Sequence, residues 1–168
     1  MANAVLYDVL NAILKKLQNR GLIGIGADNI IAQRIPSDRD ADLPAVKFPC
    51  IVIAPAGPEG LDSEAGMTSQ DDIVYRILIA ILASDVNNVV DSRFNLYLTW
   101  RESIRKLFHD SASGAVTINT VSAGTSQGGI VYNVTVQPLD VVDKAAWFNR
   151  AKYASGLILN VVSREPRG

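Results

Sequence analysis

The alternation of residue types along the middle of the chain predicts a long β-strand over residues 71–83. β-Branched and aromatic side chains recur there at every second position, which is typical of strands. The other face opens with Arg76 and then becomes apolar, which indicates cover on both sides. A shorter apolar run at residues 50–55 precedes it, so we expect a long hairpin around a charged loop at residues 57–70. The first face carries Ile73, Tyr75, Ile77, Ile79 and Ile81.

The helical spacing of apolar residues predicts two amphipathic helices. The first covers residues 3–20, with Asn3 as its N-cap and Gly21 in the left-handed conformation that often follows a helix. The second runs from about residue 88 to residue 108 and has a wide apolar face. A face of that width indicates contact with the sheet and with something more, such as a neighbouring subunit.

The remaining pattern predicts strands at residues 30–35, 115–121, 130–136 and 156–162, a connector with one helical turn at 140–150, and a flexible polar tail at 163–168. The sequence shows neither an internal repeat nor a domain linker. We therefore expect a single α+β domain, with both helices packed on a mainly antiparallel β-sheet. Its predicted core comprises Val5, Leu10, Ile13, Leu17, Ile51, Ile53, Ile77, Ile79, Leu98 and Ile104.

The net charge, the single cysteine and the length of the apolar runs exclude several classes of function. The chain has 168 residues, and its net charge of −1 argues against a surface devoted to nucleic acid. The single Cys50 lies in an apolar run, so we interpret it as a small buried hydrophobe. The first residues lack the layout of a signal peptide, and no apolar run approaches membrane-spanning length. We expect the protein to work in the cytosol or in something assembled there.

Charge is distributed unevenly along the chain. Residues 38–72 contain eight acidic residues against Arg39 and Lys47, whereas residues 144–168 contain five basic residues against Glu165. The two segments are either ordinary solvated surfaces or oppositely charged faces that meet between copies.

Two segments match part of a known motif, one the EF-hand calcium loop and the other the nucleophile elbow of hydrolases, but neither has all the residues that its motif requires. Residues 38–42 place carboxylates like an EF-hand loop, but Leu43 and Pro49 stand where that loop needs Gly and Glu. Residues 124–128 spell G-x-S-x-G around Ser126, but a predicted strand follows where a nucleophile elbow needs a helix. A solvated loop and a hairpin loop are the better interpretations.

The remaining candidates, three glycines and the single histidine, are also better interpreted as structural residues. Gly21, Gly24 and Gly26 follow a helix rather than a strand, so they do not form a dinucleotide fingerprint. His109 suits the C-terminal end of the second helix, where the helix dipole favours a cation. We therefore expect no catalytic, cofactor-binding or metal-ligating residues, and a protein that is not an enzyme.

The order of elements resembles the tail terminator and tail-completion proteins of long-tailed bacteriophages. The resemblance covers most of the chain and rests on element order rather than on a fingerprint motif. It is carried by the opening helix Val5–Arg20, the proline-flanked strand Phe48–Pro55, the hairpin that continues to Ala83, the helix ending Trp100–Phe108 and the closing strand Gly156–Val162.

The resemblance implies a structural protein of the virion, made in the host cytoplasm. Members of this family form rings, usually hexamers, that cap the tail tube and join it to the head or neck. The implied partners are other copies of the chain, the tail tube protein and the neck or connector proteins, without a membrane or specific nucleic acid. Other neck or tail components (a head-completion or stopper protein, a minor tail protein), a small hydrolase and a monomeric adaptor module remain alternatives.

Three charged segments are the candidate contact surfaces of such a ring. They are the hairpin loop, the acidic segment that enters the strand at residues 50–55, and the C-terminal tail. The candidate residues are Glu59, Asp62, Glu64 and Met67 in the first, Asp38, Asp40 and Asp42 in the second, and Arg164 and Arg167 in the third.

Overall fold

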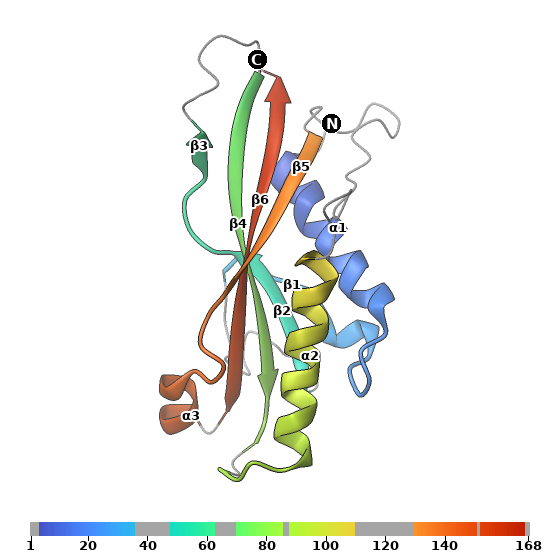
Figure 1. The fold of residues 1–168 in the computed structure, drawn as a ribbon, viewed down its shortest axis with the longest axis vertical. Helices are drawn as coiled ribbons and strands as arrows, with labels where there is room; N and C mark the ends of the chain where they lie inside the picture. Colours follow the sequence, from blue (N-terminus) through green and yellow to red (C-terminus); the bar gives the residue numbers. More distant parts are fainter. Residues whose placement is uncertain are drawn as a thin grey trace.

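A single mostly antiparallel β-sheet runs the length of the molecule (Figure 1). The structure, a computed structural model, describes residues 4–35, 48–62, 70–85, 88–109, 130–150 and 152–166. Within these residues, the strands lie in the order β1-β2-β4-β6-β5, β3 pairs with β4, and only the β1–β2 pair is parallel. The strands are β1 Ile30–Ala32, β2 Cys50–Pro55, β3 Gly60–Asp62, β4 Gln70–Ala83, β5 Ile130–Pro138 and β6 Tyr153–Pro166.

The two 14-residue strands β4 and β6 form the spine of the sheet. Their register pairs Gln70 with Pro166 at one end and Ala83 with Tyr153 at the other. Because side chains alternate between faces along a strand, odd-numbered residues of both strands point to the same side. This side carries Ile77 and Ile79 of β4 and Leu157 and Leu159 of β6, all fully buried.

Two long helices cover that side of the sheet, α1 Val5–Arg20 and α2 Ser92–His109 (Figure 1). A short helix η1, Ala27–Asn29, leads from α1 into β1. Both helices and the odd-numbered strand residues contribute to one hydrophobic cluster, in which Trp100 is 2% exposed. Burying a large apolar side chain contributes about 1.5–3 kcal/mol, so this cluster provides most of the driving force for folding.

The described residues cover the opposite side of the sheet only in part. A second cluster joins β2, β4 and β6 to the short helix α3, Lys144–Arg150, through Cys50, Val52, Leu82, Ala146 and Ala154. Along the rest of this side, the even-numbered residues from Val74 to Leu78 and from Ile158 to Val162 are half-buried or exposed.

The observed fold confirms the α+β class and the mainly antiparallel sheet. Strand β2 has the predicted bounds, and Gly21 has the left-handed conformation, with φ of 64°. Within the predicted 57–70 loop, residues 60–62 form the additional strand β3. The predicted strand at residues 115–121 lies outside the described residues.

Several predicted boundaries were wrong for identifiable reasons. Strand β6 extends to Pro166 because β4 continues beside it to Gln70, so residues 163–166 are not a free tail. Helix α2 begins at Ser92 rather than near residue 88, because the Asp91 carboxylate accepts bonds from the backbone N–H groups of Arg93 and Phe94 and so caps the helix.

Two predictions about the helices were also wrong. Helix α1 begins at Val5 with Ala4 as its N-cap and without a side-chain capping bond, so the predicted start at residue 3 was wrong, and Asn3 lies outside the described residues. Leu98 is only half-buried and lies outside the core cluster, because α2 turns Tyr97, Trp100 and Ile104 toward the sheet instead. Leu10 packs against the core as a half-buried residue.

Candidate functional site

One end of the sheet gathers acidic residues from three strands. Residues 59–62, 70–75 and 163–166 meet there, where β3, the start of β4 and the end of β6 lie side by side (Figure 1). These segments contain five acidic residues and one basic residue, Arg164. We call this region the acidic strand end. Its acidic residues are Glu59, Asp62, Asp71, Asp72 and Glu165.

Arg164 is held by its own chain within the acidic strand end. Its guanidinium donates two hydrogen bonds to the carboxylate of Asp72, from Nε to Oδ1 at 2.8 Å and from NH2 to Oδ2 at 2.9 Å. The side chain of Asp72 is 13% exposed and that of Arg164 is 50% exposed. Arg164 therefore has an acidic partner within its own chain, and its predicted contact with another copy stays a prediction.

A second bond in the same region uses a buried tyrosine. The hydroxyl of Tyr75 donates to Oε1 of Glu165 at 2.7 Å. Burial raises the pKa of Tyr75 far above its ordinary value, and the bond to Glu165 raises it further. Asp71 lies directly opposite Glu165 in the register, so two like charges are neighbours across the strands.

The predicted contact residues divide into described and undescribed positions. Glu59 is exposed just before β3, and Asp62 lies in β3 opposite Asp72, which also pairs with Arg164. The structure thus brings residues of the hairpin and of the C-terminal segment to one place, although the sequence assigned them to separate surfaces. Asp38, Asp40, Asp42, Glu64, Met67 and Arg167 lie outside the described residues.

The helical layer has the opposite charge. Residues 4–35 and 88–109 contain four acidic and eight basic residues, of which only Arg101 is buried among the basic ones. Lys16 also lies over the ring of Phe108, 5.7 Å from its centroid, which ties α1 to α2. We call this surface the basic helical layer. Its remaining basic residues are Lys15, Arg20, Arg34, Arg93, Arg105 and Lys106.

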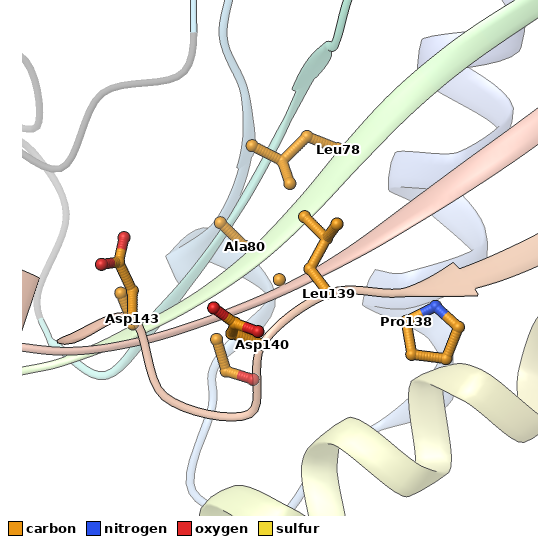
Figure 2. A pocket seen from close by; sticks show the side chains of 9 residues that line it. Leu78, Ala80, Pro138, Leu139, Asp140 and Asp143 are labelled. Carbon is orange, nitrogen blue, oxygen red and sulfur yellow. The ribbon is translucent and has the colours of Figure 1, made fainter. Parts of the chain in front are cut away.

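A groove of about 580 Å³ opens on the half-covered side of the sheet (Figure 2). Leu78, Ala80 and Gly156 form its floor, and the segment from Pro138 to Asp143 forms its rim. Leu139 reaches over Gly156 so closely that a β-carbon there would lie 3.0 Å from Leu139 Cδ1. Glycine at position 156 therefore allows the rim to close down on the sheet.

The rim of the groove is fixed by a buried arginine. Arg101 of α2, 9% exposed, donates from NH1 to Ser155 Oγ at 2.6 Å and to the carbonyl of Gly156 at 2.7 Å. Its NH2 group donates to the carbonyl of Leu139. Burial lowers the pKa of Arg101, yet a guanidinium stays charged in proteins. The sequence offered one signal of this role, an arginine within the buried stripe of α2.

Two carboxylates stand at the groove. Asp143 accepts hydrogen bonds from the backbone N–H groups of Ala145 and Ala146 and so caps α3. Asp140 is exposed, and both side chains line the groove (Figure 2). The groove therefore combines an apolar floor with an acidic rim, a combination that suits an apolar side chain next to a cation.

The residues weighed as possible catalytic groups are Cys50, His109 and Ser126, and the structure describes the first two. Burial raises the pKa of the Cys50 thiol to about 11, so the thiol stays protonated at neutral pH, as its interpretation as a hydrophobe requires. Helix α2 ends at His109, in agreement with the predicted helix end. Ser126 lies outside the described residues.

The part of the chain that the structure describes holds neither a candidate metal site nor a membrane-spanning helix. No three or more His, Cys, Asp or Glu side chains of that part gather closely enough to hold a metal ion. None of its helices combines the length and the apolar character needed to cross a bilayer.

Comparison with known proteins leaves the family open. No protein-family model matches the chain, and no curated protein gives a significant match.

Proposed function

We propose that this chain is a phage structural protein, a tail terminator whose copies form a ring that caps the tail tube and joins the tail to the neck. The observation that carries the proposal is the separation of charge between the acidic strand end and the basic helical layer. Two different, complementary surfaces on one domain suit a head-to-tail contact between copies.

A head-to-tail contact explains why a ring is the expected product. Each copy that uses its acidic strand end leaves its basic helical layer available for the next copy. Repetition of such a contact either closes into a ring or continues into an open filament, depending on the rotation between neighbours. Because Arg164 is engaged with Asp72, the helical layer replaces the C-terminal segment as the basic partner in this proposal.

The proposed task is assembly and requires no catalytic group. One face of the ring would contact the last ring of the tail tube and stop its growth, and the other would receive neck proteins. The element order of the chain supports this assignment, as do the half-buried residues on the open side of the sheet, since interfaces bury such apolar surface.

The first experiment measures the mass of the purified protein by native mass spectrometry and images it in negative stain. We expect closed particles with a central hole at about 0.05 M salt and fewer of them at about 0.5 M salt, because salt screens exposed charges. A protein that stays monomeric at every concentration and salt level would contradict the ring proposal.

Charge reversal then tests the two surfaces. The double variant Glu59→Lys and Asp71→Lys should weaken assembly without unfolding the monomer. The matched control, Asp28→Lys and Glu102→Lys, makes the same change of net charge within the basic helical layer and should preserve assembly. Equal effects of both variants would indicate a response to net charge alone, against complementary surfaces. Deletion of residues 164–168 is not a clean test, because Arg164–Pro166 pair with β4.

A further inference from the structure

The turn between α1 and η1 holds one apolar side chain out into solvent. Ile23 is 80% exposed, whereas Leu22 and Ile25 on either side of it are buried in the core. The left-handed residues Gly21 and Gly24, with φ of 64° and 81°, allow the chain to reverse here. Ile23 therefore projects from a turn whose neighbours are anchored.

Hydrogen bonds fix this turn further. The indole N–H of Trp100 donates to the carbonyl of Ile23 at 2.8 Å, and the backbone N–H of Ile25 donates to the carbonyl of Leu22 at 3.1 Å. The side-chain amide of Gln18 donates to the carbonyl of Ile30 at 3.2 Å. A side chain on a fixed turn loses little conformational entropy on binding, which favours its use as an anchor.

The groove has the complementary character. Its floor is apolar, and its rim carries the carboxylates of Asp140 and Asp143 (Figure 2). Arg101 holds the rim in place through its bonds to the carbonyls of Gly156 and Leu139. Beside Ile23, at the end of α1, stands the exposed cation Arg20. An isoleucine next to an arginine matches an apolar floor next to two carboxylates.

We propose that Ile23 of one copy inserts into the groove of the next copy, with Arg20 beside Asp140 and Asp143. The proposal rests on the ring proposed above and adds a second contact between neighbouring copies, separate from the acidic strand end. The end of α1 lies on one side of the molecule and α3, which follows the groove rim, lies on the other (Figure 1). A copy can therefore offer its turn to one neighbour and its groove to another, as a head-to-tail contact requires.

The primary test is the substitution Ile23→Asp, with Val90→Asp as its matched control. Both residues are more than three-quarters exposed, Ile23 at 80% and Val90 at 83%, so neither change should unfold the monomer. Loss of one buried isoleucine should raise the dissociation constant between copies about ten- to hundredfold, measured by analytical ultracentrifugation. Val90→Asp should leave that constant within about twofold of the unsubstituted protein.

A mixing experiment tests the direction of the contact. Leu139→Asp places a charge in the groove, and we expect it to prevent assembly as Ile23→Asp does. A mixture of the two variants still contains one intact turn, on the Leu139→Asp copy, and one intact groove, on the Ile23→Asp copy. The mixture should therefore form heterodimers, seen by native mass spectrometry, and no rings.

A cysteine pair gives a measurement that does not depend on loss of assembly. With Ile23→Cys and Leu139→Cys on one chain, oxidation should link copies into a ladder that ends at the ring, since native Cys50 is fully buried. If the unsubstituted protein forms rings while Ile23→Asp assembles normally and the cysteine pair gives no ladder, this contact is wrong and the ring stands. If the unsubstituted protein forms no rings, the proposed function itself fails.

Discussion

The two sides of the central sheet are built from the same strands, yet their side chains are buried to different extents. On the helical side, β4 and β6 place Ile77, Ile79, Leu157 and Leu159 against α1 and α2, and all four are fully buried. On the open side, Leu78 and Ile158 alternate with them and remain half-buried beside a groove. A single strand thus places fully buried side chains on one face and half-buried ones on the other, so packing changes from one residue to the next.

Neighbouring residues of β4 give the strongest test of this difference. Ile79→Ala should lower the free energy of unfolding by about 2–5 kcal/mol, because it leaves a cavity in a closed core. Leu78→Ala, on the open side, should lower it by less than about 1.5 kcal/mol, because the groove is already open to water. Urea denaturation measures both. Equal losses would mean that the open side is as tightly packed as the helical side.

The second prediction concerns Arg101, which joins the helical layer to the groove. Arg101→Met keeps the length of the side chain and removes its donors to Ser155, Gly156 and Leu139. Because bonds to a charged group contribute about 1.5–3 kcal/mol, the loss of unfolding free energy should lie in that range. Amide hydrogen exchange should also accelerate over residues 139–143 while the centre of β6 stays protected. A variant with unchanged exchange there would contradict the positioning role of Arg101.

The smallest expected effect is at Cys50, in the second cluster beneath α3. Folding raises the thiol pKa from about 9.0 to about 11, so the stability it contributes is complete below pH 9 and is lost as pH rises toward 11. Cys50→Ala should remove this part of the pH dependence, measured by urea denaturation at pH 8 and pH 10.5. Alkylation by iodoacetamide at pH 8 should be slow in the native protein and fast in urea. Rapid native alkylation would indicate that α3 opens.

The sequence predicted those features that depend on local periodicity. The strand at residues 50–55, the helix ending at Arg20 and the left-handed Gly21 follow from spacing within a few turns of chain, and they are confirmed. Leu98 shows the limit of that reasoning. Its helical spacing was correct, but the rotation of α2 about its axis is decided by the sheet, which selects Trp100 and Ile104 instead.

Contacts between distant segments could not be obtained from one sequence. The bond between Arg164 and Asp72 joins residues 92 positions apart within one chain. The groove likewise depends on Gly156 lying under Leu139, a pairing of β6 with the segment after β5. Neither pairing can be recognised from the local sequence, because the residues are brought together only by the pairing of distant strands.

The pairing of β4 with β6 also has a consequence for the timing of folding. The spine of the sheet joins two strands separated by about 70 residues of chain, and the cluster that includes Ile77 and Leu157 cannot close until both exist. At a synthesis rate of about 5–20 residues per second, β4 waits about 4–14 s for its partner. During that interval the edge of β4 that pairs with β6 is exposed on the nascent chain, so this is the stage at which a chaperone would matter most to the yield of folded protein.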